Sequence, residues 1–202
     1  MKVGLRLLLG LLTLVAIASQ LVIHVRMGAN VVNFFSYFTN LSNLLAAGVL
    51  LLTARTQAMP AWTDRVRAIS AMNMAVVGIV FTLLLRNEDL GALQPWVNFV
   101  LHDLMPCVVV LDWLFDPPSI RLGVRDLMQF LVFPAAYLAY CLLRGAQTGW
   151  YPYPFLNPTR VGGYGGVAVY AVGITVIFLL VGWTLLALGN RLGSNRRLGT
   201  AT

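Results

Sequence analysis

Residues 33–54 read NFFSYFTNLSNLLAAGVLLLTA, a mostly apolar stretch that predicts a membrane-spanning helix. At a rise of about 1.5 Å per residue, such a run is long enough to cross a hydrocarbon core of about 30 Å. A polar stripe interrupts the apolar residues at the helical spacing i, i+3, i+4 and i+7: Ser36, Thr39, Asn40 and Asn43. Polar groups are costly in lipid, so this stripe is expected to face the interior of a helix bundle.

The rest of the chain has a similar composition. Its 202 residues are 59% hydrophobic and only 10% charged, whereas soluble domains carry about 25% charged residues. The chain is therefore predicted to be an all-α polytopic membrane protein whose partners are membrane lipids. The net charge of +7 does not indicate a nucleic-acid partner, because the cations are scattered through short loops. No cofactor and no metal is expected, and the composition does not define an oligomeric state.

Hydropathy predicts six membrane-spanning helices within a transmembrane domain, 1–189, followed by a mobile cytoplasmic tail, 190–202. The predicted spans are 5–25, 33–54, 67–86, 94–115, 125–144 and 166–189. Their connections are short except for 145–165, which reads GAQTGWYPYPFLNPTRVGGYG. Glycine and proline exclude a regular helix there, and the aromatic residues suit the headgroup region. This loop is expected to act as a lid or as an interfacial plug.

The first span admits a second interpretation as a cleavable signal peptide. Two cations precede an apolar stretch that ends in Ala16-Ile17-Ala18, which resembles a signal-peptide cleavage site. The apolar residues continue through Ile23, which favours an uncleaved helix.

Thr39 and His102 are the candidate chemical groups. If their helices enter from the outer face near Asn33 and Gln94, Thr39 lies about 9 Å and His102 about 12 Å into the membrane. A hydroxyl and an imidazole at a similar depth can act as a nucleophile and its general base. Asn98 precedes His102 by four residues, so it is placed to orient the imidazole ring.

Acyl transfer to a threonine hydroxyl also needs hydrogen-bond donors for the oxyanion. Asn40, Asn43 or a tyrosine of the 145–165 loop is predicted to supply them. Arg160, in the same loop, is a candidate for binding a lipid headgroup or a carboxylate, although a solvated loop cation is the competing interpretation. The polar stripe also has a competing interpretation, because Ser, Thr and Asn commonly hydrogen-bond across membrane helices without any ligand.

Two acidic residues lie in the fourth predicted span, and each is predicted to have a different role. Asp103 directly follows the candidate histidine, and adjacent helical residues do not face each other. It is therefore predicted to pair with Arg86 or Arg144 from another helix. Asp112 lies near the cytoplasmic end of the span and is predicted to be part of an interfacial anchor.

The segments around the candidate residues resemble the Pr6Pr family of bacterial membrane proteins. They read FTNLSNLL around Thr39, HDLMPCVVVLDWL from His102 and YPYPFLNP in the 145–165 loop. More distantly, the arrangement resembles the androgen-induced transmembrane hydrolases, which cleave fatty acid esters of hydroxy fatty acids with an intramembrane threonine and histidine. The resemblance implies that Thr39 is the nucleophile and His102 the general base of a lipid ester hydrolase or acyltransferase in a bacterial plasma membrane.

Two other classes of function stay open. A small-molecule or lipid transporter would use the polar stripe to line a route, although the chain shows neither an internal repeat nor paired broken helices. A non-catalytic scaffold would use the stripe for contacts between helices.

Both termini are predicted to be cytoplasmic, because that orientation places ten Lys and Arg residues inside and four outside. The inner ten are Lys2, Arg6, Arg55, Arg65, Arg67, Arg121, Arg125, Arg191, Arg196 and Arg197; the outer four are Arg26, Arg86, Arg144 and Arg160. A reporter fused after Gly189 should show the activity of a cytoplasmic fusion. Periplasm-type activity from the same fusion would contradict this topology.

Overall fold

The computed structural model describes residues 3–54, 60–89 and 91–199, and within these ranges the chain is helical, with no β-strand. Its helices long and apolar enough to cross a membrane are Val3–Arg26, Ala61–Leu85, Pro95–Phe115, Val124–Thr148 and Tyr164–Ser194. A further apolar helix, Phe38–Ala54, has 17 residues. The protein is therefore an all-helical integral membrane protein, and the count of six spans stays a prediction.

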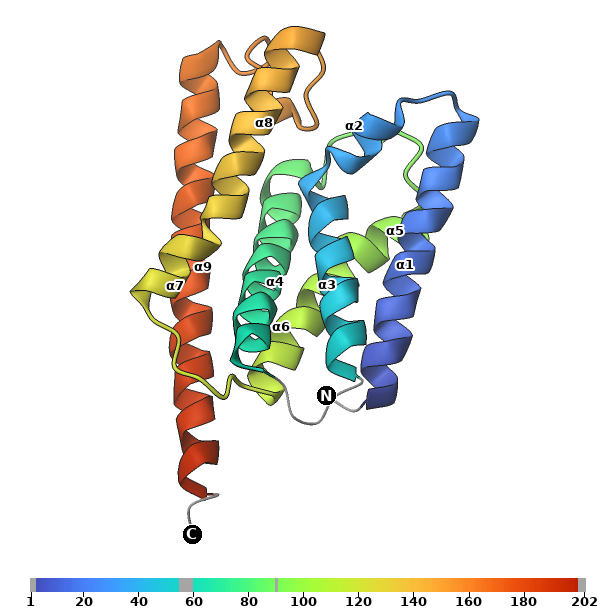
Figure 1. Ribbon diagram of the computed structural model, residues 1–202. Coiled ribbons are helices and arrows are strands. Elements are labelled where there is room, and N and C mark those ends of the chain that lie inside the picture. The colour runs from blue at the N-terminus through green and yellow to red at the C-terminus, as the bar shows by residue number, and fades with distance from the viewer. Residues whose placement is uncertain (1–2, 55–59, 90, 200–202) are drawn as a thin grey trace.

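The helical elements pack side by side into one bundle (Figure 1). In order they are α1 (Val3–Arg26), α2 (Val31–Phe35), α3 (Phe38–Ala54), α4 (Ala61–Val80), η1 (Phe81–Leu85), α5 (Pro95–Phe99), η2 (Val100–Leu104), α6 (Met105–Phe115), α7 (Val124–Phe130), α8 (Val132–Thr148), η3 (Pro154–Leu156) and α9 (Tyr164–Gly199). The α8 and α9 helices lie along one side of the bundle and α1 along the other (Figure 1).

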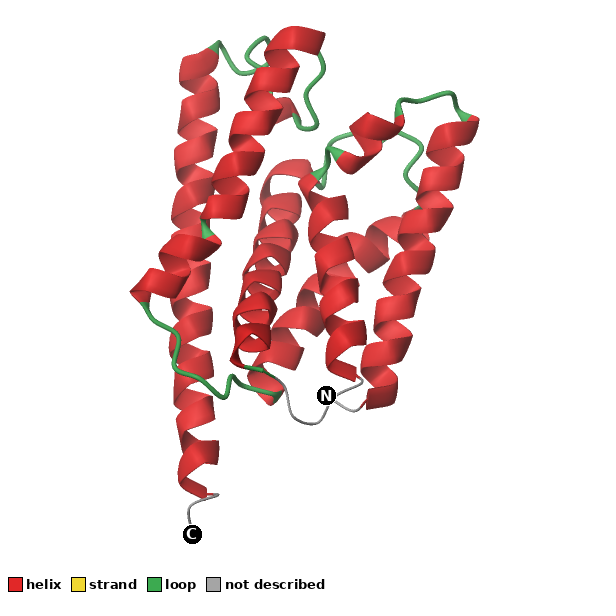
Figure 2. Cartoon of the chain, viewed as in Figure 1, coloured by secondary structure: helices red, strands yellow, loops and turns green. Residues whose placement is uncertain are grey.

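The beginning of α1 and the end of α9 lie at the same end of the bundle (Figure 1). This arrangement suits two termini in one compartment, but the compartment itself stays a prediction. Lys2 and Arg55, which contribute to the charge count, lie outside the described residues, as do the side chains of Arg196 and Arg197. The loop between α8 and α9 lies at the opposite end (Figure 2).

The predicted span 33–54 is divided in the structure. The α2 helix ends at Phe35 and α3 begins at Phe38, so Ser36 does not share a helix with the other stripe residues. The hydroxyl of Ser36 donates to the carbonyl of Val32 at 2.7 Å, and the carbonyl of Ser36 accepts from the Tyr137 hydroxyl at 2.7 Å. Because these bonds satisfy the polar groups that the interruption frees, a helix break is tolerated at this position.

Other predicted boundaries also differ from the structure. The fourth span contains a π-helical turn, η2, which is followed closely by Pro106, a residue without an N–H to donate. The α9 helix continues through Gly199, past residue 189, where the sixth predicted span ends. Asn190 binds the backbone of Leu122, donating to its carbonyl at 2.7 Å and accepting from its N–H at 3.0 Å. This residue therefore fastens the last helix to the loop before α7.

A buried ionic cluster joins α1, α4 and α6 near the end where α1 begins. Arg6 Nη2 lies 2.8 Å from Asp112 Oδ1, and Arg67 Nη2 lies 3.4 Å from Asp112 Oδ2. Asp116 and Asp64 extend the cluster, at 2.7 Å from Arg6 Nη2 and 3.6 Å from Arg67 Nη1. Asp112 is only 4% exposed, so its expected role as an interfacial anchor is wrong. Its carboxylate lies inside the bundle because two guanidinium groups from other helices surround it.

We predict that Asp112→Asn destabilises the protein by about 1.5–3 kcal/mol, because two buried guanidinium groups lose one charged hydrogen-bond partner and keep Asp116 and Asp64. The measurement is thermal or denaturant unfolding of the purified protein in detergent. The matched control is Arg65→Ala, which removes an ion pair with Asp126 in which the arginine side chain is 46% exposed. That loss should cost about 1 kcal/mol or less. Equal stability of the two variants would contradict this account of the cluster.

Candidate active site

A cavity of about 200 Å³ lies among α3, α4, η1, α8, α9 and the loop before α9. Its wall is mainly aliphatic and aromatic, and the described lining residues that carry hydroxyl groups are Thr39, Tyr137, Tyr153 and Thr175. Two of these hydroxyls donate to backbone carbonyls, Tyr137 to Ser36 at 2.7 Å and Thr175 to Ala171 at 2.8 Å. A mainly apolar cavity with a few polar groups suits a hydrocarbon ligand with one polar function.

Thr39 lies in the first turn of α3, at the wall of this cavity, and is 7% exposed. A backbone N–H in the first turn has no partner within its own helix. The N–H of Thr39 instead donates to the hydroxyl of Tyr153 at 3.3 Å, and Thr39 Oγ1 lies 3.5 Å from the same oxygen. The break before Phe38 therefore places the backbone and the side chain of Thr39 against one phenol.

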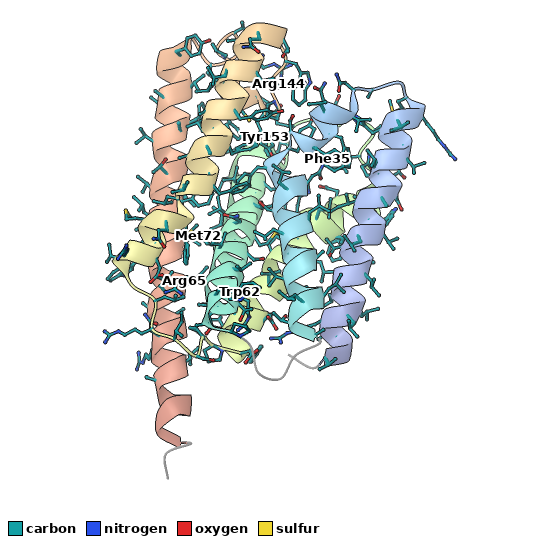
Figure 3. All side chains as sticks on the ribbon, viewed as in Figure 1. Phe35, Trp62, Arg65, Met72, Arg144 and Tyr153 are labelled. Carbon is teal, nitrogen blue, oxygen red and sulfur yellow. The ribbon has the colours of Figure 1, made fainter. Side chains whose placement is uncertain are left out.

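Tyr153 comes from the loop between α8 and α9 and lies near the start of α3 (Figure 3). Its ring stacks on Phe155 with a centroid separation of 5.1 Å and meets the ring of Tyr37 edge-on at 5.7 Å. Burial raises the pKa of the Tyr153 phenol to about 12. The phenol is therefore protonated at neutral pH and can act as a hydrogen-bond donor.

His102 lies in η2 and is 9% exposed. Its ring stacks on Phe81 with a centroid separation of 4.1 Å and an interplanar angle of 22°. Its Nδ1 lies 3.3 Å from the backbone carbonyl of Asn98. Because a carbonyl only accepts hydrogen bonds, Nδ1 must carry a proton, and in the neutral ring Nε2 is then the basic nitrogen. The Asn98 backbone, and not its side chain as predicted, orients the ring.

The structure does not join Thr39 and His102 by a direct hydrogen bond. Among the described residues, the side-chain partner of Thr39 Oγ1 is Tyr153, and the imidazole contacts Phe81 and the Asn98 carbonyl. In the described residues, each of the two side chains is therefore held by its own partners.

Two bridges nevertheless connect the segments that carry these side chains. Asn43 Nδ2 donates to the carbonyl of Thr39 at 2.9 Å and to the carbonyl of Leu101, the residue before His102, at 3.1 Å. Phe81 lines the cavity on which Thr39 lies and also stacks on the imidazole. The start of α3 and the π-helical turn η2 are therefore parts of one packed unit.

Of the predicted site residues that the structure describes, Thr39 lines the cavity, whereas His102 and the others do not. Asn40 donates from Nδ2 to the carbonyl of Phe34 at 2.7 Å, which fastens α3 to α2. Arg160 is exposed in the loop before α9 and does not line the cavity. Asp103 Oδ1 lies 3.1 Å from Arg86 Nη2, so the expected pairing with Arg86 is confirmed.

Sequence reasoning missed Phe81 and the two π-helical turns that carry Phe81 and His102. Turns of this kind occur frequently at functional sites. One signal was available, because Pro106 follows His102 by four residues and cannot donate the helical hydrogen bond to its carbonyl. No comparable signal marks η1, whose sequence FTLLL is an ordinary apolar segment.

These features define a helical membrane protein with a buried hydroxyl at the wall of an apolar cavity. The family model described as FAR-17a/AIG1-like protein matches residues 6–187 and thus includes both Thr39 and His102. The chain belongs to this family, which is associated with hydrolase activity. AIG1 stands for androgen-induced gene 1, so the match supports the distant resemblance to the androgen-induced proteins. No curated relative and no solved structure matches the chain.

We predict that Gly145→Ala displaces the loop that carries Tyr153. A Cβ atom at residue 145 would overlap the ring of Tyr151, which lies against α8 at this point. Overpacking of this kind typically costs about 1–3 kcal/mol. The unfolding temperature in detergent should therefore fall, and proteolysis within 149–163 should become faster.

The matched control for this loop prediction is Gly48→Ala in α3. No heavy atom lies within 4 Å of a Cβ placed there. Alanine is the better helix former by up to about 1 kcal/mol, so stability should be unchanged or slightly raised. An unaltered unfolding temperature together with unaltered proteolysis of Gly145→Ala would show that the Tyr151 contact does not hold the loop.

Proposed function

We propose that the protein is an intramembrane hydrolase or acyltransferase of fatty-acyl esters, with Thr39 as the nucleophile and His102 as the general base. The observation that carries this proposal is the Thr39 hydroxyl at the wall of an apolar cavity, in a member of a hydrolase-associated family. The acyl chain occupies the cavity, and the ester carbonyl lies at the hydroxyl. Membrane lipids are the proposed source of the substrate, and the Pr6Pr resemblance favours a bacterial plasma membrane.

A single water molecule is proposed to carry the proton between the two residues. Asn43 Oδ1 and Asn98 Oδ1 are buried and have no hydrogen-bond partner among the described residues, and both belong to the segments that carry Thr39 and His102. A buried water molecule is stable when it has two to four polar partners. In this arrangement it accepts from Thr39 Oγ1 and donates to His102 Nε2 and Asn43 Oδ1.

The chemistry then follows the usual course of covalent acyl transfer. Thr39 Oγ forms a bond to the carbonyl carbon, while its proton passes through the water to His102 Nε2. Collapse of the tetrahedral intermediate breaks the bond to the alcohol, which takes the proton from the imidazolium. A water molecule then attacks the acyl-threonine by the same route and releases the fatty acid. In an acyltransferase, a second alcohol replaces this water.

We predict that Thr39→Ala and His102→Ala each abolish nearly all ester hydrolysis, and that Thr39→Ser retains part of it because the hydroxyl survives. The loss in the double variant should not exceed the larger single loss by much, since the two residues act as a unit. Activity should fall as the imidazole becomes protonated at low pH, because the cation has no lone pair to accept the proton. The measurement is turnover of a panel of fatty-acyl esters by purified protein.

The control for this series is Thr184→Ala in α9. The Thr184 hydroxyl is exposed and donates within its own helix to Leu180 at 2.8 Å, so its loss should leave turnover unchanged. Loss of a single membrane hydrogen bond costs about 0.6 kcal/mol on average, so the Thr39 variants should stay folded. If Thr39→Ala hydrolyses esters as fast as the wild type, the proposed mechanism is wrong. If the wild type turns over no ester of a broad panel, the transporter and scaffold alternatives are favoured.

A further inference from the structure

The proposed reaction moves negative charge onto the carbonyl oxygen of the ester, and this inference rests on that reaction. In an apolar cavity such an oxyanion needs a hydrogen-bond donor that is already in place, because water does not solvate it there. The donor has to reach an oxygen that is bonded to the carbon under attack by Thr39 Oγ1. The candidate donors are the amide groups of Asn40 and Asn43 and the hydroxyl groups of the cavity wall.

The predicted asparagine donors are already engaged. Asn43 Nδ2 has two hydrogens and donates to two backbone carbonyls, those of Thr39 and Leu101. Asn40 Nδ2 donates to the carbonyl of Phe34, and Asn40 does not line the cavity. Neither amide can turn to an oxyanion without breaking a bond that holds α3 in place.

The remaining hydroxyls of the described cavity wall narrow the choice further. Tyr137 and Thr175 each donate their single proton to a backbone carbonyl. Within the part of the chain that the structure describes, the phenol of Tyr153 has no such carbonyl partner, and its contact with Thr39 Oγ1, at 3.5 Å, is at the long limit of a hydrogen bond. A weak contact of this kind is readily exchanged for a closer one to a ligand oxygen.

The surroundings of Tyr153 keep its hydroxyl in position as a donor. The phenol stays protonated at neutral pH because burial raises its pKa to about 12. The N–H of Thr39 donates to the phenol oxygen at 3.3 Å, and a hydroxyl that accepts a hydrogen bond becomes a stronger donor. The stacked ring of Phe155 and the edge of Tyr37 fix the plane of the phenol.

We propose that Tyr153 is a further catalytic residue of this site and that its hydroxyl donates a hydrogen bond to the carbonyl oxygen of the substrate. As the bond from Thr39 Oγ to the carbonyl carbon forms, the π electron pair of the carbonyl moves onto its oxygen, and Tyr153 stabilises the resulting charge. The proton of the threonine goes to His102, and Tyr153 keeps its own proton throughout. The collapse of the intermediate returns the electron pair to the carbonyl.

The test is Tyr153→Phe, which keeps the aromatic ring and removes the hydroxyl. Loss of one oxyanion donor lowers kcat by about 100-fold or more in a well-studied protease, and a fall of this order is expected here with KM little changed. A long-chain alkyl trifluoromethyl ketone, which forms a tetrahedral adduct with a hydroxyl nucleophile, should lose affinity by a similar factor. A dialkyl ether with the same chain length has no carbonyl and should bind Tyr153→Phe as tightly as it binds the wild type.

Different results would overturn the role of Tyr153 and the proposed function. Tyr140→Phe is the matched control, since it removes a phenol that bonds Ser36 Oγ at 2.7 Å outside the cavity wall, and its kcat should match the wild type. Wild-type kcat in Tyr153→Phe, with Thr39→Ala inactive, would overturn the role of Tyr153 alone. Equal losses of affinity for the ketone and the ether would also overturn it, because they would indicate a packing role. Full activity of Thr39→Ala would overturn both proposals.

Discussion

Polar atoms inside the hydrocarbon layer need hydrogen-bond or ionic partners within the protein, because lipid offers none. At one end of the bundle, charges meet this requirement: Arg6 and Arg67 enclose Asp112, and Arg6 also donates to the carbonyl of Thr53 at 3.3 Å. Four helices, α1, α3, α4 and α6, are thereby fixed to one another. The opposite end uses mainly hydroxyls, amides and aromatic rings, beside the partly exposed ion pair of Arg86 and Asp103. The described cavity wall includes none of the residues of the buried ionic cluster.

The break between α2 and α3 connects this constraint to the candidate chemistry. A continuous helix would use the N–H of Thr39 internally, whereas the break leaves it available to Tyr153. The polar groups of Ser36 are satisfied by Val32 and by tyrosines of α8, so the break does not leave them unpaired. The bond from Tyr137, which lines the cavity, holds α8 beside the start of α3. The interruption thus shapes the surroundings of the threonine at the cavity wall.

Much of the fold and part of the site could be predicted from the sequence, for identifiable physical reasons. Long apolar runs have few structural outcomes, so helix locations and the inward orientation of Thr39 and Asn43 follow from hydropathy and spacing. The pairing of Asp103 with Arg86 follows because both need a partner and lie at similar depth. The buried position of Asp112 does not follow, because a carboxylate near a helix end suits an interface or a buried cluster equally well.

Covalent labelling can identify the nucleophile, which we propose is Thr39. Purified protein in detergent would be treated with a long-chain alkyl fluorophosphonate, digested, and mapped by mass spectrometry. We expect a phosphonate on Thr39 Oγ, formed at a rate that falls in His102→Ala. Modification of a different residue in a protein that still hydrolyses esters would show that Thr39 is not the nucleophile.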